Sequence, residues 1–297
     1  MFRFIKQCDR LLLTATLLIL CGSIATIYYI GGIQAILYRH ISFISIGIVV
    51  MILFALLDYR IFKNSPFMVL LPYALACLLL AFVLAEQKIR GASSWINILS
   101  FHFEPSEFAK LALIILLAKY FSQKHIEIRR LRHIVVSGLY ASIPLGLTLL
   151  QPDLGSALAM GSVWFGSLLF AGINRKQLLA ILMLMVIVVT MGWFFALKPY
   201  QKARILTFVN PYLDRRGSGY NALQARATAG SGGLWGTVLT TKNTLPVLVP
   251  EPYTDFTFAA FAQKFGFVGV VVLLGLYTLL LSRILAIGTR ANNNYAK

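Results

Sequence analysis

Repeated apolar runs of about 20 residues constrain this sequence more than any other feature. An α-helix rises about 1.5 Å per residue, so about 20 apolar residues cross the hydrocarbon core of a bilayer. Every backbone polar group must be satisfied inside the bilayer, and such runs therefore predict helices. We predict an all-α, polytopic membrane helix bundle, a single integral membrane domain over residues 1–297. We expect about eight transmembrane helices, near residues 11–30, 41–57, 66–85, 107–122, 134–150, 154–173, 177–197 and 265–282.

The composition agrees with that fold class and excludes others. Hydrophobic residues make up 59% of the chain and charged residues only 12%, whereas a soluble domain is usually about 45–50% apolar and about 25% charged. The formal net charge of +17 would suggest nucleic-acid binding in a soluble protein. In a membrane protein the same excess marks cytoplasmic loops and lipid contact, so we expect membrane lipids as partners and no nucleic acid.

The three cysteines, Cys8, Cys21 and Cys77, lie at the N-terminus or inside apolar runs. An odd number in these places predicts neither a disulfide framework nor a metal site. The first apolar run follows basic residues, as in a signal peptide, but it is longer than a typical signal and many further runs follow it. We therefore expect a retained membrane anchor.

The distribution of basic residues predicts the orientation in the membrane. Fifteen basic residues fall on the side that holds both termini, offset by only three acidic ones. By the positive-inside rule that side is cytoplasmic; in a bacterium, the membrane would be the inner (plasma) membrane and the other side would face the periplasm. Residues 198–253, between spans 7 and 8, then form one long extracytoplasmic loop. Seven of the ten acidic residues lie at or near this outer face, so acid–base chemistry is expected there.

Two motifs place charged residues at the outer ends of spans. Glu107 and Lys110 lie three residues apart at the start of the fourth span, on neighbouring positions of one helical face. Such a pair either fixes the depth of the helix or lies beside a polar cavity. Asp153 begins the sixth span after a short turn. It can cap that helix, or it can line a shared outer cavity.

The long loop is basic and rich in glycine. It begins with Tyr200, Gln201 and Arg204, and it later contains Gly-Ser-Gly-Gly at 230–233. Glycines expose backbone N–H groups and arginines offer charge-assisted hydrogen bonds, so the loop would suit a diphosphate-linked lipid. Because glycine-rich loops are common, this signal alone is weak.

The loop ends at an acid beside an aromatic segment. Asp255 is followed by Phe256, Phe258 and Phe261. An acid held against apolar rings can have a raised pKa, which helps a general base. The alternative is an aromatic belt at the level of the lipid headgroups, with an incidental acid.

Taken together, these motifs resemble the SEDS family (shape, elongation, division and sporulation; RodA/FtsW/SpoVE-like), with features of its RodA-like elongation branch. The matching segments occur in the family's order across nearly the whole chain. They are Trp95-Ile96, Glu104-Pro105-Ser106-Glu107 with Lys110, Gln151 to Gly155, Tyr200-Gln201, Arg204, Gly217 to Tyr220, Gln224, Gly230 to Gly233, Pro250-Glu251 and Thr254-Asp255-Phe256.

The resemblance implies a peptidoglycan glycosyltransferase that polymerises lipid II, the undecaprenyl-diphosphate-linked disaccharide pentapeptide, during cell elongation and shape maintenance. The expected partner is a class B penicillin-binding protein within the elongation machinery. By this resemblance Asp255 is the catalytic residue, a general base in an inverting transfer. A divalent cation (Mg²⁺ or Mn²⁺) could assist the leaving group, although no ligand cluster demands one. Substrate-binding or cavity residues are expected at Glu107, Lys110, Asp153, Tyr200, Gln201, Arg204, Gly219, Tyr220, Gln224, Ser231 and Glu251.

The chain also departs from the family pattern. Tyr253 replaces a histidine, and Gln263-Lys264 replaces a pair of glutamates. The family has ten spans, and this chain is expected to lack the last two. Two alternatives therefore stay open beside the enzyme: a transporter (flippase) of lipid II, and a non-catalytic, truncated scaffold of the cell-wall machinery.

Overall fold

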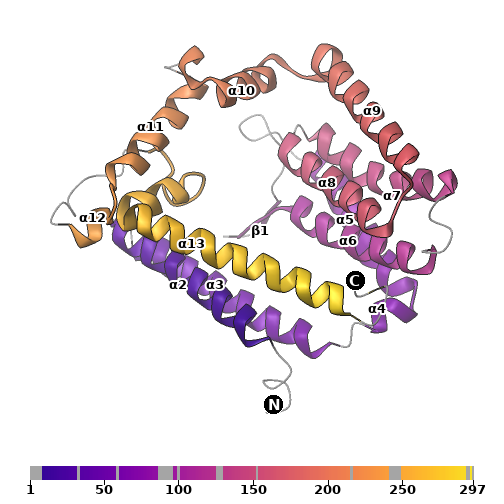
Figure 1. The fold of residues 1–297 in the computed structure, drawn as a ribbon, viewed down its shortest axis with the longest axis horizontal. Helices are drawn as coiled ribbons and strands as arrows, with labels where there is room; N and C mark the ends of the chain where they lie inside the picture. The colour runs from indigo at the N-terminus through magenta and orange to yellow at the C-terminus, as the bar shows by residue number, and fades with distance from the viewer. Residues whose placement is uncertain are drawn as a thin grey trace. The chain divides into compact units, whose positions relative to one another are not determined.

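The structure is a computed structural model, and it describes residues 9–31, 34–57, 60–85, 96–98, 101–124, 130–151, 153–214, 217–240, 249–291 and 295. Figure 1 shows helices throughout the described chain and one pair of short strands, so the predicted all-α class is confirmed. The elements are α2 (Arg10–Ile30), α3 (Gln34–Leu56), α4 (Arg60–Asn64), α5 (Phe67–Ala85), β1 (Ile96–Ile98), β2 (Phe101–Phe103), α6 (Pro105–Lys124), α7 (Leu131–Leu150), α8 (Leu154–Ala171), α9 (Arg175–Met191), the π-helical η1 (Gly192–Ala196), α10 (Pro199–Val209), the 3₁₀-helical η2 (Pro211–Asp214), α11 (Ser218–Ser231), α12 (Gly236–Leu239) and α13 (Thr257–Arg290).

Seven of the described helices are long and apolar enough to cross a membrane. They are α2, α3, α5, α7, α8, α9 with part of η1, and α13. The fourth expected span, α6, does not reach this level, because Glu107, Lys110 and Lys119 interrupt its apolar sequence. α6 packs against α5, α7 and α8, and its buried Lys119 donates to the carbonyl oxygen of Phe62 at 3.2 Å.

The chain divides into two compact units. We call the described parts of residues 57–187 and 290–297 the central unit, and those of residues 1–56 and 188–289 the terminal unit. Each is described by itself. The expectation of one integral membrane domain stays a prediction.

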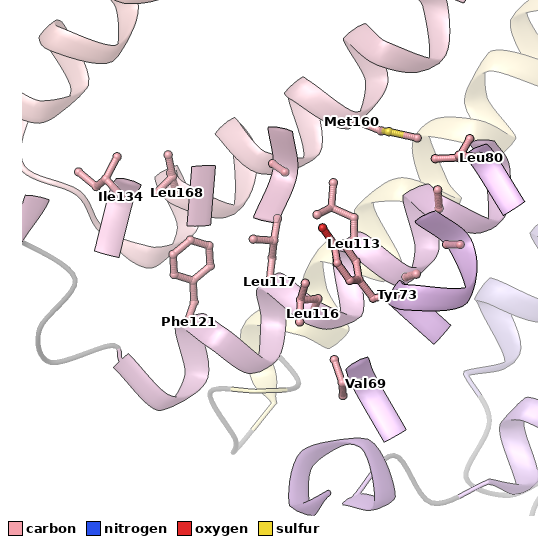
Figure 2. Packing of buried hydrophobic residues seen from close by; sticks show 14 of the residues in the cluster. Val69, Tyr73, Leu80, Leu113, Leu116, Leu117, Phe121, Ile134, Met160 and Leu168 are labelled. Atoms are coloured by element: carbon pink, nitrogen blue, oxygen red, sulfur yellow. The ribbon is translucent and has the colours of Figure 1, made fainter. Parts of the chain in front are cut away.

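The core of the central unit lies around α6. Leu113 and Leu117 of this helix are fully buried, and they pack with Leu80 of α5 and with Met160 and Leu168 of α8. Figure 2 shows these side chains converging from neighbouring helices. Helices do not gain hydrophobic free energy by leaving lipid, so the close packing of such side chains holds the bundle together.

Hydrogen bonds between helices add to this packing in the central unit. The Tyr73 hydroxyl of α5 donates to the carbonyl oxygen of Tyr140 in α7 at 2.7 Å. The Trp164 indole donates to Ser137 Oγ at 3.1 Å, joining α8 to α7. β1 and β2 form an antiparallel pair just before α6, with Ile96 opposite Phe103.

The terminal unit contains the helices α2, α3 and α13. Asp9 caps α2 by accepting hydrogen bonds from the backbone N–H groups of Leu11 and Leu12 at 3.0 and 3.1 Å. The same carboxylate accepts from Arg283 of α13, with Nε at 3.0 Å. The hydrogen bond from Arg283 and those from the backbone hold the pKa of Asp9 below its usual value.

Residues 198–253, predicted as a long loop, are helical over much of their described length. They contain α10, η2, α11 and α12. Pro199 occupies the first turn of α10, where its missing N–H costs little. That this segment lies outside the cell stays a prediction.

Candidate functional site: a carboxylate on a helix that folds back

Asp255 lies in a series of turns just before α13. The carbonyl oxygen of Glu251 accepts hydrogen bonds from the backbone N–H groups of Thr254 and Phe256 at 3.3 and 3.4 Å. Glu251 has a positive φ of 53°, the uncommon left-handed conformation for a residue with a side chain. The Thr257 hydroxyl donates to the carbonyl oxygen of Thr254 at 3.0 Å. These bonds fix the backbone on both sides of Asp255 and leave its side chain exposed.

The first part of α13 is separated from the rest by Gly266. This residue has φ 68° and ψ −171°, a conformation open essentially only to glycine. A continuous helix of 34 residues would be about 51 Å long, well beyond the roughly 30 Å of a bilayer core. Broken at Gly266, the remaining part to Arg290 is about 36 Å long and suits a single crossing.

Contacts with α2 show that the chain reverses its direction at Gly266. After the break it runs toward the start of α2, because Arg283 pairs with Asp9. Before the break it runs the other way: Phe265 packs on Tyr29 with ring centroids 6.0 Å apart, and Phe261 lies against Gly22, about two turns earlier in α2. Residues 257–265 therefore form a helix that folds back along the start of the span. We call it the re-entrant helix.

The re-entrant helix determines the depth of Asp255. Its nine residues cover about 14 Å along the helix axis. Asp255 precedes its first turn, so the carboxylate is set back from Gly266 by about that distance, toward the middle of α2. A chain that ran straight through Gly266 would instead carry Asp255 away from the span.

Glycines of the 230–236 segment hold this reversal in place. A Cβ on Gly232 would lie 2.8 Å from the Cα of Gln263, and a Cβ on Gly236 would lie 2.5 Å from the carbonyl carbon of Phe265. The backbone N–H of Phe267 donates to the carbonyl oxygen of Gly233 at 2.9 Å. The glycines thus allow direct contact between backbones, whereas the sequence had suggested that they expose N–H groups to a phosphate. Phosphate binding by this segment stays a prediction.

The other expected residues of the terminal unit lie on α10 and α11. Tyr200, Arg204 and Tyr220 have exposed side chains. The Gln201 side chain accepts a hydrogen bond from the backbone N–H of Lys198 at 3.0 Å and so caps α10. Three further expected residues lie on α11: Gly219 is packed against the carbonyl oxygens of Pro211 and Asp214, Gln224 is half-buried, and the Ser231 hydroxyl donates to the carbonyl oxygen of Thr228 at 2.7 Å.

In the central unit, Glu107 and Lys110 form the expected pair. Lys110 Nζ lies 2.5 Å from Glu107 Oε1, with Glu107 well exposed and Lys110 largely covered. The two partners of the ion pair therefore differ in exposure: Lys110 is largely covered, while the Glu107 carboxylate is accessible to a ligand or to water.

Two serines connect the Glu104 and Asp153 motifs. Asp153 accepts a hydrogen bond from the backbone N–H of Ser156 at 3.1 Å and caps α8, as one of the two interpretations of the sequence predicted. The hydroxyls of Ser106 and Ser156 lie 3.3 Å apart, and Glu104 Oε1 is 2.6 and 3.5 Å from them. The start of α6 is thus tied to the start of α8.

The sequence did not identify Ser106 or Ser156 as site residues. Both stand beside predicted carboxylates in the first turn of a helix, but serine is common there as a cap, so the signal is weak. Gln151 was also missed: its side-chain amide is buried and donates to the carbonyl oxygen of Leu80 at 2.7 Å. It fixes the turn that precedes Asp153.

The expected site residues therefore form two groups, one in each unit. Glu107, Lys110 and Asp153 lie at the starts of α6 and α8, and the others lie on α10 and α11 or in the turns before the re-entrant helix. Within the described residues, no three histidine, cysteine, aspartate or glutamate side chains are grouped so that they could hold a metal ion. The expectation of a divalent cation stays a prediction.

These observations define the class: a polytopic helical membrane protein that holds an exposed carboxylate just before a re-entrant helix. Residues 4–297 match the FtsW/RodA/SpoVE family, described as a cell cycle protein, and the chain belongs to this family. The resemblance found in the motifs is confirmed.

Relatives and solved structures agree with this assignment. Peptidoglycan glycosyltransferase MrdB of Escherichia coli (strain K12) is 30% identical over 294 residues, which cover 97% of this chain and 78% of that protein. One solved structure concerns the structural coordination of polymerization and crosslinking by a peptidoglycan synthase complex. A chain of that structure matches with a TM-score of 0.83 and 30% identity, and the match covers 98% of this chain and 81% of that one. The crystal structure of Thermus thermophilus rod shape determining protein RodA matches with a TM-score of 0.67 and 27% identity, covering 97% and 78%.

Proposed function

We propose that this chain is a peptidoglycan glycosyltransferase that polymerises lipid II into glycan strands during cell elongation. Its place is the inner membrane of a bacterium, with both ends of the chain cytoplasmic and residues 198–253 outside. The observation that carries the proposal is the re-entrant helix, which brings an exposed carboxylate, Asp255, back to the depth of a span. The similarity to a peptidoglycan glycosyltransferase supports the chemistry.

The transfer is a single displacement at the anomeric carbon of the donor sugar. Asp255 takes the proton from the 4-hydroxyl of the acceptor sugar, and the hydroxyl oxygen attacks the anomeric carbon. The new glycosidic C–O bond forms as the bond to the diphosphate breaks, and the bonding electrons leave with the diphosphate. The donor is α-linked and the product β-linked, so one displacement inverts the configuration and needs one base.

Cationic groups of the terminal unit would stabilise the departing diphosphate. Arg204 is exposed on α10, and its guanidinium can donate two hydrogen bonds to one phosphate. Donors aimed at developing charge lower the barrier more than they strengthen substrate binding. By the family resemblance, Glu107, Lys110 and Asp153 are proposed as residues of a substrate cavity, and the links through Ser106 and Ser156 tie the starts of α6 and α8 together within the central unit.

We infer that the partner is a class B penicillin-binding transpeptidase of the elongation machinery. A glycan strand becomes a wall only after crosslinking, so the polymerising site gains from a transpeptidase beside it. The similarity to a chain of a peptidoglycan synthase complex, in which polymerization and crosslinking are coordinated, supports this pairing.

The decisive experiment uses the purified full chain with its transpeptidase partner and labelled lipid II. We expect polymer from the wild type and a loss of about 10²–10⁴-fold in Asp255→Asn, since an amide cannot take the proton. Asp255 is exposed, so the melting temperature of this variant should be unchanged. Undiminished polymerisation by Asp255→Asn would refute the assigned base. A wild type without polymerising activity would refute the enzyme. It would favour the transporter if vesicles containing the chain translocate lipid II, and the non-catalytic scaffold if they do not.

A further inference from the structure

An apolar surface outside the spans is left uncovered by the terminal unit. It consists of six side chains of α10 and η2, of which Phe208 is 83% exposed and Val209 78% exposed. A surface of this kind in water would be costly, and it marks an interaction site. The six residues, which we call the α10 apolar face, are Ile205, Leu206, Phe208, Val209, Tyr212 and Leu213.

The helical spacing puts three of these side chains on one side of α10. Ile205, Phe208 and Val209 follow the i, i+3, i+4 pattern of an amphipathic helix, and Tyr212 and Leu213 follow in η2 after α10 ends at Val209. On the opposite side Thr207 is buried, with its hydroxyl donating to the carbonyl oxygen of Ala203 at 2.8 Å, while the Ala203 side chain is exposed. α10 packs there against α11 and η2. The α10 apolar face therefore points away from its own unit.

The short connection between the seventh span and α10 keeps the start of α10 close to the membrane. The seventh span extends to Phe195, and α10 begins at Pro199. An extended residue covers at most about 3.6 Å, so the start of α10 lies within about 15 Å of the end of a membrane span. Trp193 lies in η1, in the last turn of that span, with Lys202 Nζ 6.0 Å from its ring centre. Tryptophan beside a basic residue is typical of the membrane interface.

We propose that α10 and η2 form an interfacial anchor, whose apolar face inserts into the leaflet next to residues 198–253. Lys198, Lys202 and Arg204 then meet the lipid phosphates. The occupant is the bilayer itself, because the apolar face begins ten residues after the end of a span and basic residues accompany it. Interfacial helices of this type bury their apolar side about 5–10 Å into the boundary of headgroups and acyl chains.

The anchor gives the candidate site a fixed height. Tyr200 and Arg204 lie four residues apart on one flank of α10, next to the inserted face. An inserted α10 holds both at the level of the lipid phosphates, where the diphosphate of a lipid-linked sugar also lies. This consequence rests on the proposed function, whereas the insertion itself does not.

Nitroxide labels measure the insertion directly. Phe208→Cys and the matched control Ala203→Cys, on the opposite side of α10, are labelled in a full chain whose native cysteines are replaced by alanine. The protein is placed in nanodiscs of phosphatidylethanolamine and phosphatidylglycerol. We expect the label at 208 to collide mainly with oxygen, which concentrates in lipid, and the label at 203 mainly with a water-soluble nickel chelate. A label at 208 that meets the nickel chelate freely, or that is shielded from both reagents by protein, overturns the proposal.

A kinetic measurement tests the consequence for the site. In Phe208→Asp/Val209→Asp, which disfavours insertion, we expect the KM for lipid II to rise at least about tenfold, the factor that 1.4 kcal/mol represents. We expect kcat to change little, and Phe208→Leu to retain the wild-type KM. An unchanged KM in the double variant contradicts the fixed height of the site even if the labels show insertion. A wild type without polymerisation refutes the proposed function and leaves the label result intact.

Discussion

The two groups of candidate site residues are assembled by different means. In the central unit, side-chain hydrogen bonds join the elements. Ser106 and Ser156 connect Glu104 to the start of α8, which Asp153 caps, and the core of this unit contains fully buried leucines. In the terminal unit, backbones meet backbones: the Gly232–Gly236 turn lies directly on residues 262–266 and holds the reversal at Gly266.

This difference predicts which amino-acid substitutions destabilise each unit. A junction made by hydroxyl groups is weakened when a side chain is shortened, because one hydrogen bond is lost at a time. A junction made by glycines contains no side chain to remove, and it fails when a methyl group is added. The two kinds of junction can therefore be separated by mutations of opposite type.

The largest effect is expected from a methyl group at the glycine junction. Gly232→Ala places its Cβ against the carbonyl oxygen of Ala262 and the Cα of Gln263, so we expect it to cost about 3 kcal/mol of stability and to displace Asp255. Thermal unfolding in detergent and polymerisation of lipid II measure both effects. Gly230→Ala is the matched control, since nothing lies within 4 Å of its Cβ, and it should be neutral or stabilising by up to about 1 kcal/mol. Equal effects of the two substitutions would contradict the junction.

A smaller effect is expected from the serine junction. We expect Ser106→Ala and Ser156→Ala each to cost about 1 kcal/mol, as for a typical buried hydrogen bond. Because the two hydroxyls share one network, the double variant should cost less than the sum. Ser162→Ala is the control, since its exposed hydroxyl bonds only within α8. Strict additivity in a double-mutant cycle, measured by thermal unfolding, would show that the serines act independently.

The smallest effect concerns the ion pair at the other end of α13. Arg283 and the start of α2 hold the pKa of Asp9 below its unfolded value, so the ionised carboxylate stabilises the fold above about pH 4. This contribution is lost as the pH falls through the lowered pKa. The melting temperature of Asp9→Asn should therefore lie below that of the wild type at pH 7, and the gap should close toward pH 3. A gap that does not depend on pH would exclude the carboxylate charge as its cause.

The spans could be predicted from the sequence because lipid imposes a simple rule of length and polarity. The first was expected at residues 11–30 and is found at Arg10–Ile30; the sixth was expected at 154–173 and is found at Leu154–Ala171. α6 follows the rule least well, since Glu107, Lys110 and Lys119 interrupt its apolar sequence. Helices α10 and α11 were missed because glycines and charges obscure their pattern, although Pro199 marks a helix start.

The candidate site was predictable only where its geometry is local. The Glu107–Lys110 pair follows from spacing along one helix, and the cap by Asp153 follows from its place before α8. The contact between Gly232 and Gln263 joins residues that are far apart in the chain, and no periodicity reports it. Asp255 was selected by family resemblance, whereas its depth depends on the backbone angles of Gly266.

The re-entrant helix also has a consequence for biosynthesis. The glycine turn at 232–236 is synthesised before residues 257–266, so the surface that receives the reversal precedes it in the chain. Asp255 reaches its depth only when this contact forms.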